Sequence, residues 1–184
     1  MLRSKLDAFK FDIDKQHYLL GKILLLQGMQ AVGNTNCRLE DLHYTEFNKP
    51  YFSNGFHFNI SHSGNYVLCV ISDHYEVGID IEEIKSININ EFSDCFTQNE
   101  WDCIRNSDTI LSSFYTYWTR KEAIMKADGR GMHIPLMSFE VFNNPSLVDS
   151  NSWYTKELTV ADGYVAHLAT NKDIRENYSI QQII

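Results

Sequence analysis

The sequence predicts an α+β fold, in which two helices alternate with groups of short strands. Residues 114–131 contain no proline, follow two serines that can cap a helix and end at two glycines, so they indicate one helix. An apolar run at residues 19–26, too short to cross a membrane, continues to residue 33 and is interpreted as a buried helix. Gly-Asn-Tyr-Val from residue 64 resembles Asp-Gly-Tyr-Val from residue 162, a repeat that two similar lobes would explain.

The composition excludes several classes of protein. Hydrophobic residues make up 43% of the 184 residues, which is enough for one large domain or two small lobes. The net charge of -8 argues against a protein that coats nucleic acid, because binding phosphates requires clustered basic side chains. The four cysteines show neither zinc-site nor disulfide spacing, and the N-terminus is charged where a signal peptide is apolar. We therefore expect a cytoplasmic protein without membrane association.

Strands are predicted wherever apolar and polar residues alternate. Residues 56–60 and 66–72 form a predicted hairpin, with a turn at 61–65 and the second strand fully buried. Residues 88–107 carry short helix signals, with Phe92, Phe96 and Trp101 in the core. The remaining expectations are strands at 135–142, 153–160 and 164–170, a loop at 147–152, and a polar link with a terminal strand at 173–184.

Residues 76–83 place two carboxylates on one face of a strand. Their alternation puts Val77, Ile79 and Ile81 on one face, and Asp80 and Glu82 on the other. Two carboxylates in this arrangement repel each other unless a cation lies between them, and oxygen ligands favour Mg²⁺ or Mn²⁺ over zinc. The alternative is the polar face of an ordinary edge strand.

The helix at residues 114–131 carries an unusual lysine. At about 100° per residue, Lys121 falls in the middle of an apolar stripe, while Glu122 and Lys126 lie together on its shoulder. A buried ammonium is costly unless an opposite charge meets it. The alternative is that Glu122 and Lys126 form a surface ion pair and that Lys121 extends outward to solvent.

Three motifs in register resemble the surfactin-type 4'-phosphopantetheinyl transferases. They are Asn-Ile-Ser-His-Ser-Gly from residue 59, Gly-Ile-Asp-Ile-Glu from residue 78, and Trp-x-x-Lys-Glu-Ala-x-x-Lys-x-x-Gly-x-Gly from residue 118, preceded by Lys49-Pro50. The resemblance implies transfer of phosphopantetheine from coenzyme A to a serine of an acyl or peptidyl carrier protein. It also implies two similar α/β lobes about a pseudo-twofold axis, here residues 1–76 and 77–184, with the active site in the cleft between them. We expect a monomer.

The resemblance also implies roles for individual residues. Asp80, Glu82 and Glu122 match ligands of Mg²⁺, for which Mn²⁺ can substitute, and Glu122 matches the base that deprotonates the serine. The residues that match coenzyme A contacts are Lys5, Lys49, Ser61, His62, Lys121 and Lys126. On this interpretation, Lys121→Ala weakens coenzyme A binding and relieves the fold of a buried cation.

Two departures from the family pattern stand out. Members usually carry a strand and part of a helix before the lysine that Lys5 matches, so we expect either a shortened first lobe or a misplaced start codon. His17 stands where many relatives place an arginine, which puts one phosphate contact in doubt. Two other functions remain open: a carboxylate-metal pyrophosphohydrolase that uses the same three carboxylates, and a non-catalytic module that binds coenzyme A or a carrier protein.

Overall fold

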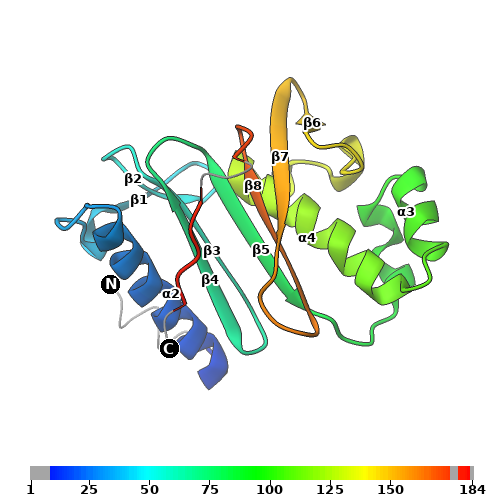
Figure 1. Cartoon of the computed structure of the whole chain (residues 1–184), viewed down its shortest axis with the longest axis horizontal. Coiled ribbons are helices and arrows are strands. Elements are labelled where there is room, and N and C mark those ends of the chain that lie inside the picture. The colour runs from blue at the N-terminus through cyan, green and yellow to red at the C-terminus, as the bar shows by residue number, and fades with distance from the viewer. Residues whose placement is uncertain (1–8, 175–177, 183–184) are drawn as a thin grey trace.

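The fold consists of two lobes, each with a long helix packed on antiparallel strands. The computed structural model describes residues 9–174 and 178–182 and is shown in Figure 1. The first lobe contains α2 (Asp12–Ala31), a small pair β1 (Leu42–Tyr44) and β2 (Pro50–Phe52), and the hairpin β3 (His57–Ser63) and β4 (Tyr66–Ser72). The second contains β5 (Val77–Glu83), α3 (Gln98–Arg105), α4 (Ile110–Asp128), β6 (Ser146–Val148), β7 (Asn151–Leu158) and β8 (Tyr164–Thr170). The predicted α+β class and two-lobed architecture are confirmed.

Helix α2 packs on the β3–β4 hairpin through a narrow stripe. Its buried residues recur at every fourth position, namely His17, Gly21, Leu25 and Met29. The glycine allows close approach, because a Cβ at Gly21 would lie 3.1 Å from Ile60. The helix was predicted to be buried, and this was wrong for its outer face, where Leu20 and Ile23 are each 48% exposed.

The hairpin is confirmed, with a tighter turn than expected. Ser63 pairs with Tyr66, so only Gly64 and Asn65 lie between the strands. The expectation that residues 66–72 are fully buried was wrong, because every residue of β4 is half-buried. The core of the first lobe instead gathers Leu25, Met29, Phe52 and Phe58.

The second lobe is a four-stranded antiparallel sheet in the order β5-β8-β7-β6, crossed by α4. Two clusters form its core. The larger lies between α4 and the residues that follow it, and includes Ile124, Met125, Phe139 and Trp153. The other joins α3 to α4 and contains Phe96 and Trp101, as predicted, with Phe92 packed against it.

The two lobes are joined by side chains of β3 that take the place of a backbone ladder. The amide nitrogens of Ile79, Ile81 and Glu83 on β5 donate hydrogen bonds to side-chain oxygens on β3. The acceptors are Asn59 Oδ1 at 3.0 Å, Ser61 Oγ at 3.4 Å and Ser63 Oγ at 3.0 Å. The separation is 20 residues each time, so the two strands run in the same direction. Strand β5 is therefore covered on this side, not an exposed edge strand.

Helix α4 approaches β5 most closely at Gly78. A Cβ at this glycine would lie 2.1 Å from the carbonyl oxygen of Ala123 and 2.3 Å from the amide nitrogen of Ala127. Both are backbone atoms of the helix, which cannot turn aside as a flexible side chain can. The absence of a side chain at Gly78 therefore sets how far α4 lies from the strand that carries Asp80.

We expect Gly78→Ala to lower the free energy of unfolding by about 1 to 3 kcal/mol, because overpacking forces the helix and strand apart. Urea unfolding of the two proteins measures the loss. Gly163→Ala is a control that tests a different cause, since Gly163 has a φ of +79° and no atom within 4 Å of its added Cβ. A stability for Gly78→Ala equal to that of the wild type would contradict the close contact.

Several local predictions beyond α4 were wrong. Residues 135–142 do not form a strand but contain a short 3-10 helix, Leu136–Ser138, because the carbonyls of Leu136 and Phe139 turn toward the Lys121 ammonium. In the predicted loop at 147–152, only residues 149–150 form a turn, with Asp149 in the left-handed region at a φ of 52°, and the flanking residues pair as the β6–β7 hairpin. In the tail, residues 173–174 and 178–182 contain no strand.

Candidate functional site

A buried carboxylate, a lysine and a serine meet where β3, β5 and α4 come together. Lys126 Nζ donates to Asp80 Oδ1 at 2.6 Å and to Ser61 Oγ at 3.0 Å. Ser61 Oγ in turn donates to the same Asp80 oxygen at 2.9 Å. Burial raises the pKa of the Asp80 carboxyl, and Lys126 opposes this rise. The ion pair of Lys126 is therefore formed with Asp80 on β5, not along the helix with Glu122.

Glu82 lies two residues further along the same face of β5. Its Oε2 accepts a hydrogen bond from Ser63 Oγ at 2.9 Å. Burial raises the pKa of Glu82, the serine bond lowers it, and the neighbouring Asp80 raises it. Both carboxylates predicted on this strand face are thus held by serines of β3.

Glu122 faces these two carboxylates from α4. Burial raises its pKa first, then Lys126 lowers it, and Asp80 and Glu82 both raise it. The side chain is half-buried, so its carboxylate is partly deprived of water. The structure therefore brings the three predicted carboxylates into electrostatic contact around one lysine.

His62 adjoins the same group from the end of β3. Its ring stacks on that of His17 with centroids 4.5 Å apart, and His17 Nε2 lies 2.9 Å from the carbonyl oxygen of Gly64. The pKa of His62 is lowered by burial and then by His17 and Lys126, against the opposing effect of Asp14 and Asp80. His17, which stands in place of an arginine, is thus part of the same surroundings.

Lys49 reaches the C-terminal end of α4 from the first lobe. Its Nζ donates to the carbonyl oxygen of Ala127 at 2.6 Å, one of the helix carbonyls left without an intrahelical partner. Its path runs past Gly129, where an added Cβ would lie 2.7 Å from Lys49 Cδ. Burial lowers the pKa of Lys49, and Glu76 and Asp128 oppose this. Lys49 therefore lies next to the turn of helix that carries Lys126.

Lys5, the other lysine of the first lobe expected to contact coenzyme A, falls outside the described residues.

Lys121 is not part of the carboxylate group, and its expected contact with coenzyme A is corrected. Its side chain has no exposed surface. The ammonium bonds to Glu100 Oε2 at 2.9 Å and to the carbonyl oxygens of Leu136 at 2.7 Å and Phe139 at 2.6 Å. With three oxygen partners in the interior, it has no donor left to present to a phosphate in this conformation.

Glu100 is the partner of Lys121 that sequence reasoning missed. It was expected only as part of a short helix, yet it is fully buried and also accepts the amide of Val141 at 2.9 Å. The available signal was the capping box, since Thr97 and Glu100 bond each other's backbone at the start of α3. That pattern located the helix start but not the lysine that reaches the same carboxylate.

Comparison with known proteins assigns the chain to a family. Residues 76–181 match a family model described as the 4'-phosphopantetheinyl transferase superfamily, and residues 2–74 match one described as 4'-phosphopantetheinyl transferase, N-terminal. The first match covers more than half of the chain. The chain belongs to the 4'-phosphopantetheinyl transferase superfamily.

Individual relatives differ in how much of their length this chain covers. It is 39% identical to the 4'-phosphopantetheinyl transferase gsp of Aneurinibacillus migulanus over 71% of this chain and 56% of that protein. It is 31% identical to the 4'-phosphopantetheinyl transferase Sfp of Bacillus subtilis over 97% of this chain and 84% of that protein. Holo-acyl-carrier-protein synthase of Thermotoga maritima matches 52% of the chain, and 61% of its own, with a TM-score of 0.42 and 15% identity.

The three carboxylates fit a divalent cation in chemistry, but this structure does not arrange them around a common point. Among residues 9–174 and 178–182, no three His, Cys, Asp or Glu side chains are arranged to hold a metal. Asp80 Oδ2, however, is buried and has no hydrogen-bond partner. An unpartnered carboxylate oxygen, with two further carboxylates nearby, is the hard donor set that Mg²⁺ and Mn²⁺ prefer.

A second buried network of hydrogen bonds joins α4 to the sheet beside the three carboxylates. His167 on β8 pairs in register with Asp80 and is fully buried. Arg120 Nε donates to His167 Nε2 at 3.3 Å, so Nδ1 carries the proton and donates to Thr119 Oγ1 at 2.7 Å. The Thr119 hydroxyl then donates to the carbonyl oxygen of Tyr115 at 2.7 Å. A protonated imidazole could not accept from Arg120.

We expect His167 to make the protein less stable in mild acid. Burial, with a smaller contribution from Arg120, lowers the pKa of His167 to about 3. The pKa of a histidine in the unfolded chain is near 6.5. Between these two pKa values the unfolded chain binds a proton that the folded chain does not bind. The free energy of unfolding therefore falls by up to about 1.4 kcal/mol for each unit by which the pH is lowered. Urea unfolding of wild type and His167→Gln from about pH 7.5 to 5 isolates this contribution. Parallel stability curves would contradict it.

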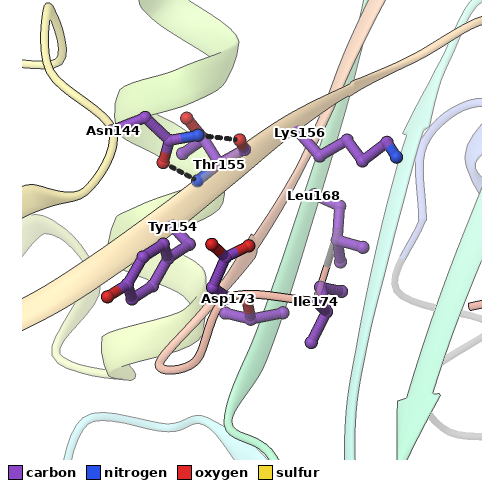
Figure 2. Close-up of a pocket in the computed structure, with 8 residues that line it drawn as sticks. Asn144, Tyr154, Thr155, Lys156, Leu168, Asp173 and Ile174 are labelled. Carbon is purple, nitrogen blue, oxygen red and sulfur yellow. Dashed lines mark hydrogen bonds between the residues drawn. The ribbon is translucent and has the colours of Figure 1, made fainter. Parts of the chain in front are cut away.

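Two cavities lie away from the carboxylates. One of about 300 Å³ is formed by β7, β8 and the segment after β8, and Figure 2 shows Asn144 bonded to the backbone of Thr155 at its rim. The other, of about 420 Å³, lies in the loop after α2, around Cys37 and Arg38. Neither is lined by a residue predicted for the site.

No helix in the described part of the chain has the length and apolar character of a membrane span.

Proposed function

We propose that the chain transfers 4'-phosphopantetheine from coenzyme A to a serine hydroxyl of an acyl or peptidyl carrier protein, with Mg²⁺, and releases adenosine 3',5'-bisphosphate. The observation that carries the proposal is the meeting of Asp80, Glu82 and Glu122 around Lys126. Family membership and the relatives named as 4'-phosphopantetheinyl transferases support it. The proposal places the enzyme in the cytoplasm as a monomer, with lobes at residues 1–76 and 77–184.

Glu122 is the proposed general base. A carboxylate partly removed from water and beside two others is a stronger base than an exposed one, as the raised pKa of Glu122 indicates. The serine oxygen attacks the phosphorus that carries the pantetheine arm, its proton passes to Glu122, and the bond to the leaving bisphosphate breaks. Asp80, Glu82 and Glu122 would hold the cation, which supplies charge neutralisation at the pyrophosphate when bound.

The cationic residues are proposed to bind coenzyme A. Lys126 is 28% exposed at its side chain, so its ammonium can turn from Asp80 to a phosphate. His62 and Ser61 offer donors beside it, and Lys49 offers one at the end of α4. Neutralising the leaving bisphosphate is the main contribution that such residues make to phosphoryl-type transfer. Lys5 remains a proposed phosphate contact, whereas Lys121 is not included.

The test is to incubate the protein with an apo carrier protein, coenzyme A and Mg²⁺ and to weigh the carrier by mass spectrometry. Transfer adds one phosphopantetheine group to the carrier and releases an equal amount of bisphosphate. A pyrophosphohydrolase would cleave coenzyme A without changing the mass of the carrier. A binding module would do neither, and either of these results would overturn the proposal.

A further inference from the structure

Two serines of β3 hold the two carboxylates of β5 in the same way. Ser61 Oγ donates to Asp80 Oδ1, and Ser63 Oγ donates to Glu82 Oε2, both at 2.9 Å and both across 19 residues of sequence. Because strands repeat every two residues, a Ser-x-Ser segment lies opposite an Asp-x-Glu segment in register. The two serine–carboxylate pairs thus form part of the junction between the lobes.

Each serine hydroxyl accepts an amide hydrogen of β5 and donates to its carboxylate, and Ser61 Oγ also accepts from Lys126. Ser63 Oγ accepts the amide hydrogen of Glu83 at 3.0 Å, and Ser61 Oγ accepts that of Ile81 at 3.4 Å. An amide nitrogen only donates and an ionised carboxylate only accepts, so the single hydroxyl proton of each serine must point to its carboxylate. The backbone of β5 therefore orients the hydroxyl, and the hydroxyl orients the carboxylate.

Asn59, the first member of the series, provides the contrast. Its Oδ1 accepts the amide hydrogen of Ile79 at 3.0 Å, as the serines do for Ile81 and Glu83. The residue that precedes Ile79 is Gly78, which has no side chain to receive a second bond. Asn59 thus joins the lobes without holding a carboxylate, whereas Ser63 does both.

We propose that Ser63 is a positioning residue, which restrains the Glu82 carboxylate at β3 so that it can share a divalent cation with Asp80 and Glu122 when the cation binds. The inference rests on the proposed function for the identity of that cation. Ser61 acts likewise on Asp80, but it also contacts Lys126 and is a proposed coenzyme A contact, so its substitution would change several things at once. Ser63 isolates the effect on one carboxylate.

The test measures binding of Mn²⁺ to the purified full chain by the loss of the free-ion signal in electron paramagnetic resonance. Ser63→Val and Ser63→Thr have the same shape and differ in the hydroxyl alone. We expect Ser63→Val to weaken Mn²⁺ binding about 10- to 100-fold, as loss of a partner that orients a ligand does, and Ser63→Thr to stay close to wild type. Asn59→Ala removes a bond between the lobes and should leave Mn²⁺ affinity unchanged.

Thermal unfolding without metal shows whether each variant is folded at the temperature of the titration. Equal Mn²⁺ affinity in Ser63→Val and Ser63→Thr would overturn the inference, as would an equal loss in Asn59→Ala or a wild type that does not bind Mn²⁺. The carrier-protein mass measurement on the wild type separates this result from the proposed function. If the carrier gains no mass while Mn²⁺ affinity still follows the Ser63 hydroxyl, the proposed function fails and the role of Ser63 stands.

Discussion

Glu122→Gln is expected to lower turnover by about 100- to 10,000-fold, the usual cost of losing a general base. Glutamine keeps the shape of the side chain but can neither accept the serine proton nor add a third negative charge to those of Asp80 and Glu82 at a cation. The free energy of unfolding should be unchanged or slightly raised, because the substitution removes the repulsion between the Glu122 carboxylate and those of Asp80 and Glu82. Steady-state kinetics with apo carrier protein at varied coenzyme A and Mg²⁺ measures the effect.

Glu91→Gln is a suitable control, because it removes one negative charge from an exposed 3-10 turn, where Glu91 bonds only Asn88 within the part of the chain described. It should leave turnover close to wild type. If Glu122→Gln kept near-normal turnover at saturating Mg²⁺, Glu122 would be neither base nor essential ligand. A loss restored fully by raising Mg²⁺ would assign it to the cation alone.

Lys121→Met is expected to lower the free energy of unfolding by about 3 to 5 kcal/mol, the cost of leaving a buried charge without its partner. Glu100 is fully buried and would lose the ammonium at 2.9 Å, while the carbonyls of Leu136 and Phe139 would lose their donor. This reverses the sign expected from the sequence, where removing Lys121 was predicted to relieve the fold. Urea unfolding at neutral pH measures the change.

A double-mutant cycle with Glu100→Gln distinguishes the ion pair from lost packing. Glutamine is neutral and can still accept the amide of Val141, so the double variant should be more stable than Lys121→Met alone. The Michaelis constant for coenzyme A should change little at temperatures where the variants are folded. A stable Lys121→Met protein with a raised Michaelis constant would return Lys121 to its predicted role at a phosphate.

The sequence located the elements of the site better than their contacts. The alternation at residues 76–83 correctly placed Asp80 and Glu82 on one face of β5, because side-chain direction in a strand depends only on local geometry. The prediction that a glycine ends this helix was likewise correct, since Gly129 follows α4 in the left-handed region at a φ of 92°. Whether these residues bind metal and coenzyme A stays a prediction.

Partners distant in sequence were not predictable from local pattern. The helical wheel correctly put Lys121 in a buried stripe, but it could not name Glu100, which lies on another helix and contacts it only after α3 packs on α4. The same ammonium turned residues 135–142 away from the strand that their alternation predicted, because two of their carbonyls bond to it. A long-range contact thus overrode a local preference.

The sequence by itself determined the α+β class, the helices and strands that carry the carboxylates, and the family to which the chain is similar. Only the tertiary structure decided that Lys126 pairs with Asp80 and that Lys121 pairs with Glu100. It also decided that the serines of β3 hold the carboxylates of β5. The physical reason is that periodicity fixes the direction of a side chain relative to its own element, whereas its partner depends on which elements bury their apolar faces together.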